Sequence, residues 1–128
     1  MANFFDLISR IFISSIFLFS GYNKIFNYEN TIEWMEGFNI PGFLLWPTIV
    51  LEIILPILII IGYRTKVSAI LLAAFCIATA VIFHLDFANQ MQTIAFFKNF
   101  ALAGGFLFIA VHGPKEWSME KKKKYVRL

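Results

Sequence analysis

The chain has 128 residues, of which 59% are hydrophobic and only 15% are charged, whereas an average soluble domain carries about a quarter charged residues. This composition excludes a soluble globule and a disordered chain, and the length allows a single membrane domain. The net charge of +3 comes from basic residues that gather after residue 113, a pattern that argues against nucleic-acid binding and favours the cytoplasmic side of a membrane.

Four segments are long and apolar enough to cross a bilayer, which takes about 20 such residues. They cover residues 4–22, 43–62, 67–84 and 93–112. The connections between them are mostly short, so neighbouring helices should be antiparallel. We therefore expect an all-α membrane protein, folded as an antiparallel bundle of four transmembrane helices.

The segment between the first two spans, residues 27–42, is too polar to cross the membrane. Asn30 begins a capping-box pattern that marks a helix start, and Gly37 is placed to end that helix. The apolar residues in between fall roughly on one side. We expect a short helix that lies at the membrane interface, with Asn30 as its N-cap.

Basic residues in the loops set the orientation, because Lys and Arg are retained on the cytoplasmic side. One side of the bundle holds only Lys24. The other side holds Arg64, Lys66, Lys115, Lys121, Lys122, Lys123, Lys124 and Arg127. Both termini are therefore expected in the cytoplasm, with residues 1–114 as the membrane domain and 115–128 as a basic cytoplasmic tail. The protein should be a multi-pass protein of the inner (cytoplasmic) membrane.

Three ionisable residues interrupt the apolar spans, namely Arg10, Glu52 and Lys98. Such groups are costly at membrane depth and usually face the bundle interior. A helical rise of about 1.5 Å per residue gives the depth of each residue along its span. By these depths Glu52 could pair with Arg10 on one side and with Lys98 on the other. The alternative is that Glu52 and its bases form a buried latch that fixes helix register without any chemistry.

Helical periodicity predicts which side of each span faces inward. Small and charged residues share stripes at 100° per residue, and small residues let helices approach closely. The predicted inward stripes are Arg10, Ser14, Phe17, Gly21 and Lys24 in the first span, Ala69, Ala73 and Ala80 in the third, and Lys98, Ala101, Gly105 and His112 in the fourth.

A second polar cluster is expected in the outer half of the bundle, where Lys24, His84, Asp86, Lys98 and Asn99 come together. Histidine can accept a hydroxyl proton, while Lys and Asn can donate hydrogen bonds to a carbonyl oxygen. These are the groups that the head of a quinol or quinone needs. The alternative is that they are ordinary interfacial residues in contact with water.

Metal or covalently held cofactors are not expected. The single cysteine, Cys76, cannot form a disulfide or a Cys-ligated metal site by itself. The two histidines, His84 and His112, close opposite ends of antiparallel helices, most of a roughly 30 Å slab apart, so they cannot share one haem iron. Any redox chemistry must therefore involve a partner.

The sequence resembles the DoxX family of small four-helix membrane proteins along nearly its whole length. The resemblance rests on short motifs in a fixed order: Arg10, Ser20-Gly21-Tyr22-Asn23-Lys24, Ile40-Pro41, Glu52, Gly62-Tyr63-Arg64-Thr65, Phe83-His84, Lys98-Asn99, Gly104-Gly105 and Gly113-Pro114. Lys115 stands where the family's ending has a second glycine.

The resemblance implies a relation to subunits of a quinol oxidase and of a thiosulfate:quinone oxidoreductase. The leading hypothesis is therefore a membrane subunit of a quinone-linked redox complex that binds a quinone-type or lipid-like ligand. In it, His84 and Asp86 would accept protons, and Lys24, Lys98 and Asn99 would bind the headgroup. The buried charges of Glu52 and Arg10 would relay protons or position the head.

Two other functions fit the same residues. Arg10, Glu52 and Lys98 could line the path of a small transporter or permeation subunit, although four helices are few and no inverted repeat is visible. A non-catalytic scaffold or assembly factor could instead use its lysine-rich tail on anionic lipid or an acidic partner. The expected partners are the lipid bilayer, a redox partner protein and a second copy of the chain.

Overall fold

The computed structural model describes residues 1–119. In that range the helices are α1 (Ala2–Phe26), α2 (Tyr28–Glu36), the short 3-10 helix η1 (Gly42–Leu44), α3 (Leu45–Ile61), α4 (Thr65–Phe83) and α5 (Gln90–His112). Four segments, α1, η1 with α3, α4 and α5, are long and apolar enough to cross a membrane. The predicted all-α, four-span membrane fold is confirmed. The cytoplasmic placement of both termini stays a prediction, and most of the predicted basic tail lies outside the described residues.

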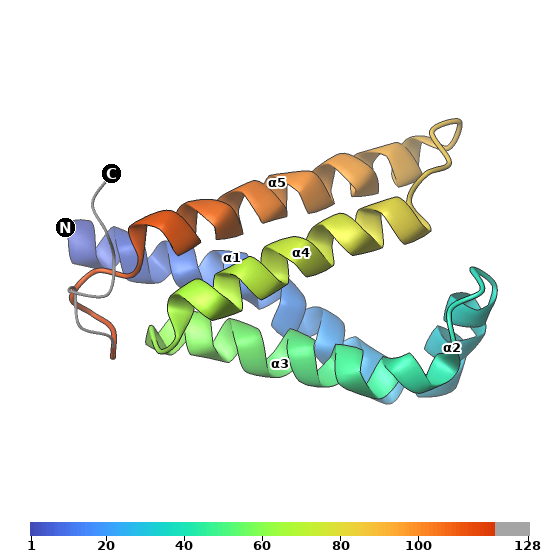
Figure 1. Cartoon of the computed structure of the whole chain (residues 1–128), viewed down its shortest axis with the longest axis horizontal. Helices are drawn as coiled ribbons and strands as arrows, with labels where there is room; N and C mark the ends of the chain where they lie inside the picture. Colours follow the sequence, from blue (N-terminus) through green and yellow to red (C-terminus); the bar gives the residue numbers. More distant parts are fainter. Residues whose placement is uncertain (120–128) are drawn as a thin grey trace.

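The four long helices run alternately up and down in two pairs, α1 with α3 and α4 with α5 (Figure 1). Contacts between α3 and α4 join the pairs. The N-terminus and the α3–α4 turn lie at one end of the bundle, which we call the N-terminal end (Figure 1). Helix α2 lies across the opposite end, which we call the α2 end, as a polar segment too short to span must do.

An alanine-rich face of α4 forms the centre of the core. Ala69, Ala73 and Ala80 are buried, as predicted, and leave room for α5 to approach. The α5 residues packed there are Ala103, Phe106 and Ala110. Large apolar side chains elsewhere on the helices point outward, among them Phe12, Phe19, Phe97 and Phe108, which suits a bilayer and not water.

The predicted inward stripe is correct for α1, but on α5 it holds for Gly105, which meets α1, and not for the other three residues. In α1 the buried residues are Arg10, Ser14, Phe17 and Gly21. In α5, by contrast, Lys98, Ala101 and His112 are exposed. The packing of α4 selects the alanine-containing face of α5 instead, because close helix contact in lipid depends on small residues more than on burying polar ones.

Glycines mark two close approaches of α1 to its neighbours. A Cβ on Gly21 would lie 2.8 Å from Ile53 Cγ1 and 3.4 Å from Glu52 Cβ, so α1 and α3 touch at this level. A Cβ on Gly105 would lie 2.6 Å from Ile13 Cδ1, so α5 meets α1 near mid-span. Glu52 is therefore level with the last part of α1.

The short polar helix is present, but it begins earlier than predicted. Helix α2 starts at Tyr28, so Asn30 is inside the helix and is not its N-cap. Asn27 is the one residue between α1 and α2 and occupies the N-cap position of α2, while its side chain donates back to the Asn23 carbonyl in α1. Gly37 follows the last helical residue, as predicted. Whether α2 lies at a membrane interface stays a prediction.

Candidate functional site

A cavity of about 420 Å³ lies in the α2 end of the bundle, and we call it the chamber. Its size falls within the usual range for small-molecule sites. All five α-helices contribute to its wall, which is mostly apolar with a few polar groups. The lining residues are Ile16, Phe17, Ser20, Lys24, Thr31, Trp34, Met35, Ile40, Leu44, Thr48, Glu52, Phe75, Ala78, Thr79, Ile82, Phe83, His84, Lys98, Asn99 and Leu102.

An ion pair between α1 and α3 forms part of the chamber wall. Lys24 Nζ lies 2.9 Å from Glu52 Oε1 and 3.0 Å from Oε2, and it also donates to Ser20 Oγ at 2.7 Å. Glu52 is only 3% exposed, whereas the Lys24 side chain is 22% exposed. A carboxylate so deeply buried depends on this partner to remain charged.

The helix around this pair has a proline that frees one of its carbonyls. Pro56 is four residues after Glu52 and lies inside α3. Because proline has no backbone N–H, the Glu52 carbonyl lacks the donor it would normally have within the helix. The Glu52 carbonyl oxygen is therefore a second hydrogen-bond acceptor at this level of α3, beside the Glu52 carboxylate.

The expected pairing of Glu52 with Arg10 and Lys98 is wrong. The contact at Gly21 sets Glu52 eleven residues from Arg10 along α1, or about 16 Å at the helical rise. Lys24 lies on the same stripe as Arg10 and is the base that reaches the carboxylate. Depths counted from the end of each span did not predict the Lys24–Glu52 pair, because the position of α1 along α3 is set by how the two helices pack.

His84 approaches the chamber from the junction after α4. It is the residue that ends α4, and its Nδ1 lies 2.8 Å from Gln92 Oε1 at the start of α5. In the tautomer in which Nδ1 donates to the Gln92 carbonyl oxygen, Nε2 is left as an acceptor. This tautomer suits a base that receives a proton from a ligand.

The remaining predicted site residues divide between the chamber and its surroundings. Lys98 and Asn99 both line the chamber, and Asn99 also donates to the Ala95 carbonyl in its own helix. Within residues 1–119, Lys98 has no hydrogen-bond or ion-pair partner. Asp86 is exposed in the loop before α5 and does not line the chamber. The predicted cluster is therefore brought together without Asp86.

A second, more polar cavity of about 570 Å³ adjoins the chamber, and we call it the groove. Chamber and groove share six lining residues, so they are neighbouring cavities with a common wall. The groove is lined by Ile16, Phe19, Ser20, Asn23, Lys24, Asn27, Asn30, Thr31, Trp34 and Lys98.

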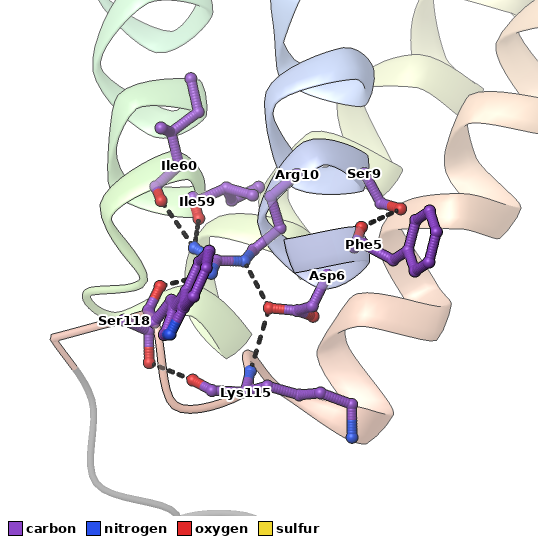
Figure 2. Close-up of polar contacts among 9 residues, drawn as sticks. Phe5, Asp6, Ser9, Arg10, Ile59, Ile60, Lys115 and Ser118 are labelled. Atoms are coloured by element: carbon purple, nitrogen blue, oxygen red, sulfur yellow. Dashed lines mark hydrogen bonds and ion pairs between the residues drawn. The ribbon is translucent and has the colours of Figure 1, made fainter. Parts of the chain in front are cut away.

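Arg10 lies near the N-terminal end of the bundle, far from the chamber, and is only 1% exposed. Its Nε donates to Asp6 Oδ2 at 3.0 Å, and its Nη1 donates to the carbonyls of Ile59 at 3.1 Å and Ile60 at 2.6 Å (Figure 2). Its Nη2 donates to the Trp117 carbonyl at 2.6 Å. Arg10 thus caps the end of α3, where carbonyls lack helical partners.

The same network holds the segment that follows α5. Asp6 Oδ2 accepts from the Lys115 backbone N–H at 3.1 Å, and Ser118 Oγ donates to the Lys115 carbonyl at 2.7 Å (Figure 2). Farther along, the Met119 N–H donates to the Ile61 carbonyl at 2.9 Å. Arg10 therefore joins α1, α3 and the chain after α5 without contacting Glu52, so the predicted latch of Glu52 with its bases does not include Arg10.

Several lining residues were missed by the sequence reasoning. Trp34 stacks on Phe83 with ring centroids 4.3 Å apart and planes 23° apart, and both rings face the chamber. Ser20 could have been found as the residue one helical turn before Lys24. The hydroxyls of Thr48 and Thr79 donate to carbonyls of their own helices, so nothing in the sequence marks them as chamber residues.

The comparisons with known proteins agree with this architecture. The DoxX family model matches residues 5–85, which is more than half of the chain. The chain belongs to the DoxX family.

Two relatives from Escherichia coli (strain K12) match nearly the whole chain. Inner membrane protein YqjF is 36% identical over 115 residues, which cover 90% of this chain and 88% of the relative. Inner membrane protein YphA is 32% identical over 123 residues, which cover 91% of this chain and 88% of the relative. No solved structure matches the chain.

With four candidate spans and these relatives, this DoxX family member is a multi-pass protein of the inner membrane. Its bilayer environment accounts for the large apolar side chains on the outside of the bundle.

Proposed function

We propose that this DoxX family protein is the membrane subunit of a quinone-linked redox complex and that it binds a quinone-type ligand in the chamber. The observation that carries the proposal is that one largely apolar cavity is lined by a buried carboxylate, Glu52, and by His84, whose Nε2 has no hydrogen-bond partner within residues 1–119. An amphiphile with a planar polar head and an apolar tail suits such a wall.

The apolar lining fits the ring of the ligand. The stacked rings of Trp34 and Phe83 form a flat aromatic surface, against which a second planar ring can pack. Phe17 and Phe75 line the wall as well, in edge-to-face contact at 6.4 Å. These four aromatic side chains exclude water from the ring and leave only its oxygens in need of polar partners.

The polar lining fits the oxygens of the head. Lys24, Lys98 and Asn99 carry N–H groups that can donate to a carbonyl oxygen. His84 Nε2 and the Glu52 carboxylate can accept the protons of hydroxyl groups. Asp86 and Arg10 have no part in this scheme, because neither lines the chamber.

A quinol gives up two electrons and two protons when it is oxidised. This chain supplies the proton acceptors, and the electrons pass to a redox partner protein. Lys24 contributes to the proton step by keeping the Glu52 carboxylate ionised and therefore able to accept a proton. Ser20 holds the Lys24 ammonium from its own helix and keeps it in place.

The test is binding of short-chain benzoquinol and naphthoquinol to the purified full chain in lipid nanodiscs. His84→Ala and Lys98→Ala should each weaken binding by about tenfold, the loss of one strong hydrogen bond. His112→Ala is the matched control, because His112 is exposed near the N-terminal end and, within residues 1–119, its hydrogen bond is to the Phe108 carbonyl in its own helix. Affinities of His84→Ala and Lys98→Ala that equal wild type would remove the proposed site.

A further inference from the structure

The groove has the chemistry of an anion site, and this is independent of any ligand in the chamber. No Asp or Glu is among its lining residues within the part of the chain that the structure describes. Two lysines and several neutral polar side chains line it instead. Helix α2 carries Glu29, Glu33 and Glu36, yet it contributes only Asn30, Thr31 and Trp34 to the groove.

One positive charge in the groove is uncompensated. Lys24 is neutralised by Glu52, which lines the chamber and not the groove. Lys98 has no partner among residues 1–119, although it is about 12 Å along α5 from Gln90. Lys98 is exposed within the candidate span α5, and an ammonium group in a membrane span is costly unless an opposite charge neutralises it. The groove is therefore electrostatically incomplete without an anion.

Hydrogen-bond donors are also available around this charge. The side-chain amides of Asn23 and Asn30 have no partners elsewhere in the described part of the chain. Both line the groove and are exposed. An ammonium group with two amides can bind several oxygens of one oxyanion, as phosphate groups require.

The edge of the groove is apolar and faces outward. Ile16 and Phe19 line it on α1, and the Phe19 side chain is 66% exposed. Helices α1 and α5 touch at Ile13 and Gly105, so the groove opens between these two helices on the α2 side of that contact. If the oxyanion bound at Lys98 is the phosphate of a lipid, the acyl chains of that lipid would lie beside Ile16 and Phe19.

From this arrangement we infer that the groove binds the phosphate of an anionic lipid headgroup, with Lys98 as its counter-charge and Asn23 and Asn30 as hydrogen-bond donors. The apolar edge favours a lipid over a soluble phosphate, because only a lipid gains from contact with Ile16 and Phe19. The site adjoins the chamber through Lys24 and Lys98, and its occupant is a different molecule.

The experiment measures lipids retained by the purified full chain in native mass spectrometry, with phosphatidylglycerol and phosphatidylcholine offered in equal amounts. Wild type should prefer phosphatidylglycerol. Lys98→Gln should reduce this preference by about tenfold, the loss expected for one charge-assisted hydrogen bond. Lys98→Arg should keep most of it, and Asn30→Leu should weaken it while the protein keeps all its charges.

Two controls separate this site from other basic groups and from the chamber. Lys66→Gln removes an exposed lysine at the opposite end of the bundle and should leave the preference unchanged. His84→Ala alters the chamber alone and should also leave it unchanged. If the protein does not bind quinol but keeps its lipid preference, the proposed function is wrong and this inference still stands.

Competition identifies the source of the phosphate. Glycerol phosphate and inorganic phosphate should displace phosphatidylglycerol poorly, because they lack the acyl chains. Displacement by inorganic phosphate at similar concentration would support the anion site and assign it to a soluble phosphate. Equal retention of the two lipids by wild type would overturn the inference, as would a preference that survives both Lys98→Gln and Asn30→Leu.

Discussion

The Lys24 ammonium bonds both carboxylate oxygens of Glu52, at 2.9 and 3.0 Å, but the two partners are not equally buried. The Lys24 side chain is 22% exposed, while Glu52 is 3% exposed. A lysine can extend its head toward a polar boundary when it loses its partner. A buried carboxylate has no such route.

This asymmetry predicts unequal costs for breaking the pair. Lys24→Met should destabilise the bundle by about 3–5 kcal/mol, because it leaves the Glu52 charge buried without a partner. Glu52→Gln should cost less, because the Lys24 head can move toward the groove. Thermal unfolding in detergent measures both, and the double variant should be more stable than Lys24→Met alone. The opposite order of the single variants would contradict this account.

Arg10 should not tolerate the replacement by lysine, although the charge is kept. Its guanidinium donates to Asp6, to two carbonyls at the end of α3 and to Trp117, and an ammonium cannot match this planar set of donors. We expect a loss of about 2–4 kcal/mol in unfolding free energy, since several buried acceptors lose their donors.

Arg64→Lys is the matched control for Arg10→Lys. Arg64 is exposed in the α3–α4 turn, with its guanidinium carbon 5.8 Å from the Tyr63 ring centre, so its replacement should change stability by less than about 1 kcal/mol. Equal effects of the two variants in chemical unfolding would show that the Arg10 network is not important for stability.

Replacement of glycine by alanine should destabilise the protein at Gly62 but not at Gly104. Gly62 has φ +73°, and a Cβ there would overlap the Ser118 side chain, so Gly62→Ala should be destabilising through backbone strain and displacement of the segment after α5. Gly104→Ala meets nothing within 4 Å, so it should be neutral or slightly stabilising, as expected for alanine in a helix. Melting temperatures in one detergent would compare the two, and a larger loss for Gly104→Ala would refute the assignment.

The attachment of α2 should depend on one aromatic stack. Trp34 lies on Phe83 at 4.3 Å between centroids, and Met35 is the buried residue of α2. Trp34→Ala should increase amide hydrogen exchange within 28–36 and leave α4 and α5 protected, because local opening follows the loss of local contacts. Trp34→Phe should preserve most of the protection. Exchange that rises equally across all helices would indicate global destabilisation instead.

Much of the architecture could be predicted because it depends on local chemistry. Span lengths follow from runs of apolar residues, and the inward stripe of α1 follows from its 3.6-residue period. On α5 the same periodicity placed Gly105 correctly against α1 but misplaced Lys98, Ala101 and His112, because the alanine face of α4 selected another face of α5. A pattern within one helix cannot reveal which neighbour it will pack against.

The sequence by itself determined that this chain spans a membrane four times, that Arg10 and Glu52 are buried, and that Ala69, Ala73 and Ala80 face inward. Only the tertiary structure decided that Lys24 rather than Arg10 neutralises Glu52, that Arg10 caps α3 and holds the chain after α5, and that Asp86 stays outside the chamber. The physical reason is that the offset of one helix along another depends on where small residues such as Gly21 and Gly105 allow contact. That offset decides which side chains meet.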